Sequence, residues 1–317
     1  KDILKKLAGK LDIKNADERI TIRTREAILE SEAFKALWER IKHKTTYRVE
    51  FDNDKLVADC ARAITDGPSI TKTRAQFRVA DIAIGKGGVE ASETSASGFA
   101  SISESDIELP DLLTDLQDKT QLTRKSLVRV LTESRRLPDF RKNPQEFIEL
   151  ASEAINRTKR LALVDGIKYQ RIGKDHYYAQ ELFQQEELTG YIKNTLEAKK
   201  SVYEHVIYDS AGVEKRFAEE LESNEAVKVY AKLPAWFKIP TPLGTYNPDW
   251  AIVVEDDGQE KLYFVVETKG SGWWDDLRHK EGAKIACGKQ HFSVLAEGEN
   301  PARYIQATSL DDVFGNI

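Results

Sequence analysis

The chain has 317 residues, 40% of them hydrophobic and 32% charged, with a formal net charge of −5. This length allows two or three domains with sizeable cores, and no apolar run is long enough to span a membrane. The two cysteines, Cys60 and Cys287, are far apart in the sequence and lack the spacing of a metal site. No signal peptide is evident, so we expect a protein of the reducing cytoplasm that has no membrane partner. Because the sequence begins at Lys1 and contains no methionine, we expect a piece of a longer protein.

Charge is unevenly distributed along the chain. Residues 201–317 contain 12 Lys and Arg against 20 Asp and Glu, a net charge of −8, whereas residues 1–200 carry +3. Contacts to phosphates usually dominate the affinity of a protein for DNA, so the acidic C-terminal part would bind DNA poorly by itself. A function on DNA would require other parts of an enzyme to position this region.

The N-terminal part mixes helical and extended patterns. Residues 33–42 place apolar side chains on one helical stripe, residues 45–51 alternate like a half-buried strand, and residues 56–64 again predict a helix. A further strand is expected over 76–84. The glycine-rich run 85–88 lacks the GxxxxGK[ST] spacing of a phosphate-binding loop, so we interpret it as a turn.

Residues 109–163 form a block of helical patterns. Thr123 can cap a helix that carries three apolar residues, namely Leu127, Val128 and Leu131. Asn143 followed by Pro144 predicts the start of another helix. Its basic stretch 157–160 could contact DNA phosphates, and a solvated helix face remains the alternative.

The C-terminal region is expected to follow a connector. In the stretch after Tyr203, Asp209 or Ser210 can cap a helix with an apolar stripe formed by Val213, Phe217, Ala218 and Leu221. A strand over 227–231 comes next. Beyond residue 270 the patterns predict a helix from Asp275 to about Lys289, strands at 292–295 and 304–307, and a terminal turn at 309–314.

Residues 246–270 organise this region. Apolar runs at 250–254 and 262–266 flank the polar turn 255–261, which is a hairpin signature. Because the start of one antiparallel strand lies beside the end of the next, Asp249 and Glu267 should be neighbours. Alternation places Glu267 and Lys269 on one face, and two carboxylates clustered on an apolar sheet are costly unless a cation holds them.

These residues form the pattern Pro-Asp, spacer, Glu-X-Lys, which resembles the PD-(D/E)XK nuclease superfamily. A second Pro-Asp pair, Pro138-Asp139, precedes a helix cap, so we exclude it. The flanking blocks SVYEHVIYDSAGVEKRFAEELE, VYAKLPAWFKIPTPLGTYNPDW and LRHKEGAKIACGKQHF give the resemblance its specificity. Residues 203–295 resemble the C-terminal endonuclease region of the Res subunit of type III restriction enzymes, and residues 38–190 more loosely resemble the part of Res between motor and nuclease.

The resemblance implies an α/β fold. Residues 203–317 would form a PD-(D/E)XK endonuclease domain, a mixed sheet flanked by helices. A connector at 166–202 and an α+β accessory region at 1–165, with a helical block, would precede it.

The resemblance also implies Mg²⁺-dependent hydrolysis of phosphodiester bonds in double-stranded DNA. Asp249 and Glu267 would be metal ligands, with the backbone carbonyl of Thr268 as a third oxygen. Lys269 would orient or help deprotonate the attacking water. Glu214 suits the carboxylate that the first helix of the superfamily often contributes to the metal site, and a first-turn acid that favours the helix dipole is the alternative.

Basic side chains of the helix after the hairpin are candidate DNA contacts. Arg278, Lys284 and Lys289 are expected to contact phosphates, with plain surface charge as the alternative. His279 and His291 have no partner with metal spacing, so no zinc site is expected.

The resemblance names partners beyond this sequence. They are the Mod methyltransferase subunit and an upstream helicase-like motor of the same polypeptide. This sequence has no motor motifs, so ATP would act only through that motor. Two alternatives stay open: a repair or junction nuclease of the same fold, and a nuclease-fold module that serves DNA binding or assembly. In a purely structural hairpin, Asp249 would cap a strand and Glu267 would pair with Lys269.

Overall fold

The computed structural model describes residues 17–50, 52–85, 88–101, 107–185, 188–208, 212–256, 260–268 and 280–316. They form a mixed α/β protein with two compact units. One unit consists of Lys1–Glu50 and Gly166–Ile317, and the other of Phe51–Asp165. No helix of the described ranges is long and apolar enough to cross a membrane.

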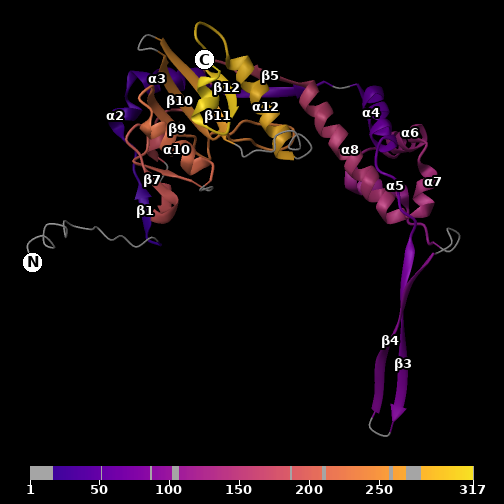
Figure 1. Cartoon of the computed structure of the whole chain (residues 1–317). Coiled ribbons are helices and arrows are strands. Elements are labelled where there is room, and N and C mark those ends of the chain that lie inside the picture. Colours follow the sequence, from indigo (N-terminus) through magenta and orange to yellow (C-terminus); the bar gives the residue numbers. More distant parts are fainter. Residues whose placement is uncertain are drawn as a thin grey trace, which may run out of the picture. The chain divides into compact units, whose positions relative to one another are not determined.

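A four-stranded sheet forms the centre of the first unit (Figure 1). Its strand order is β12–β11–β10–β9, with β9 at Val227–Lys232, β10 at Trp250–Asp256, β11 at Glu260–Thr268 and β12 at Arg303–Ala307. β10 is antiparallel to β9 and β11, whereas β11 and β12 are parallel. The predicted hairpin is confirmed.

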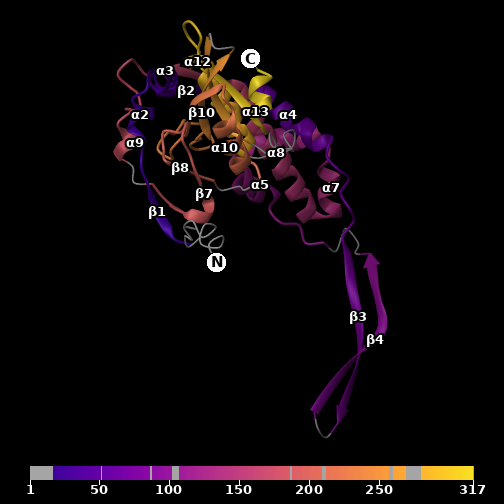
Figure 2. The ribbon, with the colours of Figure 1, turned by 60° about the vertical axis from the view of Figure 1, so that its left-hand side comes forward.

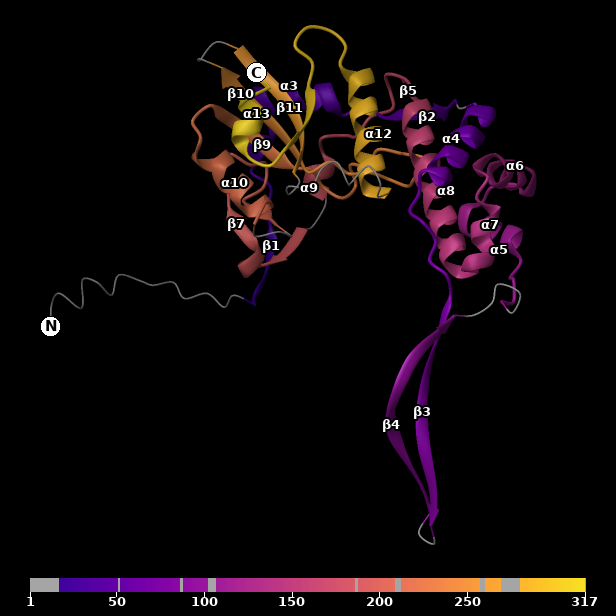
Figure 3. The same ribbon diagram turned by 45° about the vertical axis from the view of Figure 1, so that its right-hand side comes forward.

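Different helices cover the two faces of this sheet (Figure 3). On one face, Trp250 and Val266 belong to a core that includes Phe217 of α10 (Glu214–Ser223) and Val313 of α13 (Leu310–Phe314). The alternate positions face α3 (Glu32–Ile41) and α12 (Lys280–Leu295). Alternation along β11 therefore directs Glu267 away from the α10 face, towards α12.

Three predicted elements of the first unit need correction. The expected strand 292–295 is wrong: α12 continues to Leu295, because Phe292 and Leu295 are buried on its inner face at helical spacing. The helix expected after Tyr203 begins only at Glu214, with Val213 at the N-cap, and the expected caps Asp209 and Ser210 lie outside the described residues. The terminal turn is the short helix α13, capped by Ser309.

The N-terminal segment belongs to the sheet unit, whereas the sequence led us to expect 1–165 as one region. The helix predicted at 33–42 is confirmed as α3, and its Trp38 ring lies 5.0 Å from Phe183 and 5.6 Å from Phe237 between centroids. β2 (Thr45–Val49) pairs with β5 (Ile167–Arg171). These long-range contacts join residues 32–49 to residues 167–237.

Short strands and helices fill the expected connector and its surroundings. β1 (Arg19–Ile22) pairs with β6 (Leu188–Tyr191), and β7 (Thr195–Glu197) pairs with β8 (His205–Ile207). The short helices are α2 (Glu26–Leu29), α9 (Leu182–Gln185) and the 3-10 turn η2 (Ile192–Asn194). The connector is thus structured by antiparallel pairing.

The second unit contains the predicted helical block (Figure 2). Its helices are α4 (Asn53–Thr65), α5 (Leu112–Thr120), α6 (Arg124–Ser134), α7 (Leu137–Lys142) and α8 (Pro144–Gly166). The Thr123 cap is confirmed, because its side chain accepts a hydrogen bond from the Ser126 amide. Of the apolar residues on α6, Leu127, Val130 and Leu131 are buried, whereas Val128 is 47% exposed.

A two-stranded ribbon, β3 (Arg74–Gly85) and β4 (Gly88–Ser101), completes this unit (Figure 2). Gly85 pairs with Gly88, as expected for a glycine turn. Residues 86 and 87 of that turn lie outside the described residues.

Candidate active site

Asp249 and Glu267 lie at the same end of the β10–β11 hairpin. Trp250 pairs with Val266, so Asp249 and Glu267 occupy the next positions outward along the two strands. The Leu233 amide donates to the Asp249 carbonyl at 2.8 Å. This bond holds the backbone of Asp249 against the chain that leaves β9.

The Asp249 carboxyl is buried against the end of β11. Its Oδ2 accepts hydrogen bonds from the Thr268 amide at 2.8 Å and from the Thr268 hydroxyl at 2.6 Å. Burial raises the pKa of Asp249 and the nearby Glu214 adds to this rise, while the Thr268 bonds and Lys232 oppose it. The net rise means that the surrounding hydrogen bonds and cation do not fully compensate the buried charge.

Glu214 and Lys232 form an ion pair beside Asp249. The Lys232 Nζ lies 2.8 Å from the Glu214 Oε2, and the two side chains are only 22% and 16% exposed. Lys232 pairs with Trp250 in the sheet, and its Nζ lies 5.8 Å from the Trp250 ring centroid. Glu214 is also a first-turn acid of α10, so the structure adds an ion pair to the two roles considered for it.

Glu267 is held by a tyrosine pair. The Tyr246 hydroxyl donates to the Glu267 Oε2 at 2.6 Å, and the hydroxyl oxygens of Tyr246 and Tyr304 are 2.6 Å apart. Because the single proton of Tyr246 goes to the carboxylate, Tyr304 must donate to Tyr246. Burial and the neighbouring charge of Glu267 raise the pKa of both tyrosines, so both remain donors at neutral pH.

Gly288 of α12 makes room for this arrangement. A Cβ at position 288 would lie 2.2 Å from Cε1 of Tyr246. A side chain there would therefore displace the tyrosine that binds Glu267. This glycine allows close packing of the helix, and the group packed against it, Tyr246, contacts the candidate site.

The predicted carboxylates lie at the same end of the sheet but have different immediate neighbours. Asp249 binds Thr268, whose side chain also accepts from the Trp250 indole nitrogen at 3.4 Å, whereas Glu267 binds Tyr246. Burial raises the pKa of Tyr304 most, and the charges of Glu267 and Asp249 add to this rise. Lys269 lies outside the described residues.

The donor set suits a hard cation. Asp249, Glu267 and the Thr268 carbonyl offer only oxygen, and Mg²⁺ needs one or two carboxylates because it retains several waters. Among the described residues, no group of three or more His, Cys, Asp and Glu side chains is arranged to hold a metal. Oxygen donors of this kind are those that Mg²⁺ prefers, whereas structural zinc sites use mainly Cys and His.

The predicted phosphate contacts differ in their surroundings. The Lys284 Nζ lies 3.1 Å from Glu281 and its side chain is 17% exposed, whereas Lys289 is exposed on α12. Arg278 and His279 lie outside the described residues. Lys284 is therefore partly neutralised, and the DNA contacts of these residues stay predictions.

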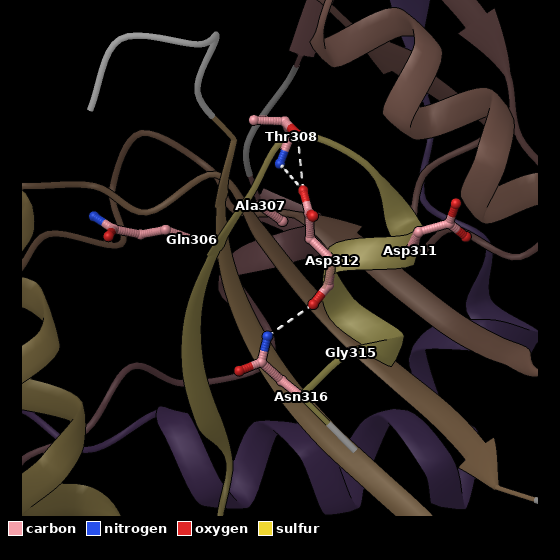
Figure 4. A pocket seen from close by; sticks show the side chains of 7 residues that line it. All are labelled: Gln306, Ala307, Thr308, Asp311, Asp312, Gly315 and Asn316. Carbon is pink, nitrogen blue, oxygen red and sulfur yellow. Dashed lines mark hydrogen bonds between the residues drawn. The ribbon is translucent and has the colours of Figure 1, made fainter. Parts of the chain in front are cut away.

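A hollow of about 500 Å³ lies near this site, at the carboxyl end of β12 (Figure 4). Its Asp312 accepts from the Thr308 amide at 2.7 Å and completes the capping box of α13, and Asn316 donates to the Asp312 carbonyl. In Figure 4 the side chain of Gln306 extends away from Asp312. The acid in this hollow caps a helix, so we do not place the reaction there.

Comparison with known proteins matched the region that contains these residues. Residues 199–309 match the family model described as "Endonuclease domain". This stretch is therefore similar to an endonuclease domain. It is similar to the Res subunits of the type III restriction-modification enzymes EcoPI from Escherichia phage P1 and EcoP15I from Escherichia coli. With each, the chain is 36% identical over 98 residues, which is 30% of this chain and 10% of the relative. The matched part of the chain thus spans about a tenth of the relatives' length. No solved structure matched.

Sequence reasoning missed several residues of the site. Tyr246 and Tyr304 reach Glu267 through hydroxyl groups, and Lys232 reaches Glu214. A lysine at the end of the apolar strand 227–231 was the available signal for Lys232. The tyrosines gave no comparable signal, because nothing in their local sequence distinguishes them from tyrosines that only fill a core.

Proposed function

We propose that the domain at 199–309 hydrolyses phosphodiester bonds of double-stranded DNA with Mg²⁺, as the cleavage domain of a type III restriction endonuclease Res subunit. The observation that carries the proposal is the placement of Asp249 and Glu267 across the end of one hairpin, inside the region that matches an endonuclease domain. The mixed sheet order and the helices on both faces are compatible with the PD-(D/E)XK architecture.

The residues divide the chemical work between binding and proton handling. Asp249, Glu267 and the Thr268 carbonyl would hold the metal, and Lys269 would orient the attacking water. Bound Mg²⁺ supplies a water of lowered pKa and offsets negative charge on the phosphate. Tyr246 fixes one oxygen of Glu267, which leaves the orientation of that carboxylate defined before DNA arrives.

The raised pKa of Asp249 predicts that metal binding depends on pH. A carboxyl must lose its proton to bind a cation, so the cation competes with protons at this position. Burial and Glu214 favour the protonated form. We therefore expect the affinity for Mg²⁺ to rise with pH in the acidic range, as Asp249 ionises.

The partners follow from the same proposal. The charge of −8 over residues 201–317 disfavours DNA binding by this region alone. We propose that the Mod subunit and an upstream helicase-like motor place the domain on DNA. ATP would act only through that motor, and the protein would work in the cytoplasm.

Incubation with supercoiled plasmid tests the proposal. The chain, and separately the Res–Mod assembly that contains it, are mixed with DNA that carries recognition sites and either Mg²⁺ or EDTA. Cleavage that needs Mg²⁺ and is lost in Asp249→Asn supports the proposal. Undiminished cleavage by an assembly with Asp249→Asn contradicts it.

Other substrates distinguish the alternative functions. Preferential cutting of branched DNA would favour a repair or junction nuclease. Binding without cutting by the complete assembly would favour a module for DNA binding or assembly. Both outcomes contradict the restriction function.

A further inference from the structure

A cavity of about 260 Å³ lies in the first unit beside the candidate active site. Thr245 lines it, and the next residue, Tyr246, donates to Glu267. Ile239 also lines it and exchanges two backbone hydrogen bonds with Tyr246, at 2.7 and 2.9 Å. The cavity and the acidic centre thus share one supporting segment.

Two histidines that line the cavity have buried ring nitrogens without hydrogen-bond partners among the described residues. His291 is 2% exposed, and its Nδ1 lies 2.8 Å from the Thr45 hydroxyl, while its Nε2 has no partner in this part of the chain. The Nδ1 of His43 is likewise buried and has no hydrogen-bond partner among the described residues. A buried polar atom left without a partner costs about 1–3 kcal/mol, so both nitrogens indicate a bound polar group.

The imidazole rings of His43 and His291 are both neutral at neutral pH. Burial lowers the pKa of His291 to about 3, and burial together with Arg171 and Lys42 lowers the pKa of His43. A neutral imidazole has one nitrogen that donates and one that accepts. A ligand edge that carries both donors and acceptors therefore suits the pair, whichever tautomer each ring adopts.

The walls of the cavity suit a flat ring. Tyr178 and Phe237 line it, with ring centroids 5.2 Å apart. The Tyr178 hydroxyl donates to the Lys238 carbonyl at 2.8 Å, which fixes the tyrosine ring. Aromatic faces with a few polar groups at the edge are typical of pockets for planar heterocycles.

The rim combines cations with exposed apolar side chains. The Lys44 Nζ lies 4.4 Å from the Tyr178 ring centroid, and Lys238 is exposed. Ile172 and Tyr177 are 45% and 43% exposed, and the Lys42 Nζ lies 4.5 Å from the Tyr177 ring centroid. Lysines interleaved with exposed aromatic rings are typical of surfaces that bind single-stranded nucleic acid.

We propose that this cavity binds one unpaired nucleobase, with Lys44 and Lys238 at the phosphates of the same strand. The proposal rests on the proposed function in that the strand is the DNA held at Asp249 and Glu267. The base lies in the cavity against the wall formed by Tyr178 and Phe237, and its polar edge binds His43 and His291. A free mononucleotide has the same chemistry, so the test separates the two sources.

Binding of DNA to the chain is measured in EDTA, so that the measurement does not depend on cleavage. Fluorescence anisotropy compares three labelled duplexes: fully paired, with one extrahelical adenine, and with an abasic residue at the same bulge. Stacking contributes about 1–3 kcal/mol per base, so we expect the bulged base to bind on the order of tenfold tighter than the abasic bulge. Equal affinity for the two bulges overturns the proposal and leaves a cavity that holds only water.

Matched variants locate the effect. His291→Phe keeps a ring but removes the Nε2 that would bind the polar edge of the base, so it should reduce the tenfold preference, whereas His176→Phe, at an exposed histidine, should retain it in full. Lys238→Ala should weaken both bulged duplexes with a shallower salt dependence, and Lys174→Ala serves as its control. Thermal melting confirms that each variant folds. An unchanged preference in folded His291→Phe also overturns the proposal.

Adenosine 5′-monophosphate is titrated in parallel. Tighter binding of the bulged duplex supports a site for the DNA strand, and tighter binding of the mononucleotide overturns that assignment. Because cleavage is measured separately, Mg²⁺-dependent cutting without any base preference would overturn the cavity proposal alone.

Discussion

Asp139 and Asp249 each follow a proline, one in the helical unit and one at the end of the sheet. Asp139 lies in the first turn of α7 and accepts from Arg136 at 2.7 Å and from Lys142 at 2.6 Å. Lys142 and Arg136 lower the pKa of Asp139. Asp249 is bound by Thr268 next to a second carboxylate, and burial raises its pKa. The two aspartates have opposite electrostatic environments.

This contrast separates a structural acid from a candidate catalytic acid. The charge of Asp139 is compensated by two cations of its own helix and its N-cap, so its ionised form stabilises the fold. The charge of Asp249 is a cost to the fold until a further cation is added. Substitution of Asp139 should therefore lower stability and leave cleavage unchanged, whereas substitution of Asp249 should impair cleavage without lowering stability.

The largest expected effect is on cleavage by Asp249→Asn. The amide retains an oxygen that can accept from Thr268 but loses the charge that would bind Mg²⁺. We expect DNA cleavage to fall by at least about a hundredfold, with thermal stability at pH 7 unchanged or raised. Plasmid cleavage and calorimetry measure the two quantities.

Asp139→Asn is the matched control. It should leave cleavage unchanged and lower stability. The contrast fails if Asp139→Asn impairs cleavage as strongly as Asp249→Asn does in folded protein.

A second expected effect comes from Gly288→Ala. The added Cβ would overlap the Tyr246 ring, and overpacking of this kind costs about 1–3 kcal/mol. We expect a lower melting temperature together with reduced cleavage, because Glu267 loses its support. Gly212→Ala is the control, since a Cβ there meets nothing within 4 Å. Equal stability of both variants would show that Tyr246 is not confined as described.

Tyr246→Phe sharpens the same point with a smaller change. It removes the hydroxyl that donates to Glu267 and keeps the ring. Groups that orient metal ligands typically contribute about ten- to hundredfold to affinity, so we expect at least about tenfold weaker Mg²⁺ binding by calorimetry. Tyr208→Phe removes a comparable hydroxyl that donates to the Lys193 carbonyl at 2.6 Å, and it should leave Mg²⁺ affinity unchanged.

The smallest expected effect is the pH dependence of stability. The lowered pKa of Asp139 contributes stability above the pKa of the unfolded chain, and this contribution is lost as pH falls through the folded pKa. Asp139→Asn should thus cost about 1 kcal/mol at pH 7 and little near pH 3. For Asp249 the pKa is raised, so the pH dependence of stability has the opposite sign. The carboxyl group contributes favourably to stability below its pKa in the unfolded chain, and this contribution is lost as pH rises through its pKa in the folded chain. The stability of Asp249→Asn relative to the wild-type chain should therefore be higher at pH 7 than at pH 3. Urea unfolding at both pH values measures the difference, and parallel pH profiles would contradict it.

Local patterns predicted the elements that carry the site. The alternating runs at 250–254 and 262–266 formed the hairpin, and the stripe of Phe34, Leu37, Trp38 and Ile41 formed α3. These predictions depend on periodicity within one element. The position of Asp249 next to Glu267 followed from hairpin geometry for the same reason.

Contacts between distant elements could not be predicted. Nothing in the local pattern of Thr45 indicates that it binds His291, 246 residues away, and so the N-terminal segment was placed with the helical block. Phe292 and Leu295 fit a strand as well as a helix, because a short apolar run does not define its period. Tyr246 was distinguished from a core tyrosine only by its partner Glu267 and by Gly288.

Calorimetric titration with Mg²⁺ tests the central claim, that Asp249 and Glu267 share one divalent cation. It is performed on the wild-type chain, Asp249→Asn, Glu267→Gln and the double variant. Two ligands of one ion are strongly coupled, so we predict that each single variant loses at least about tenfold in affinity and that the double variant loses little more. Unchanged affinity in either single variant, or losses that add fully in the double variant, would contradict a shared ion.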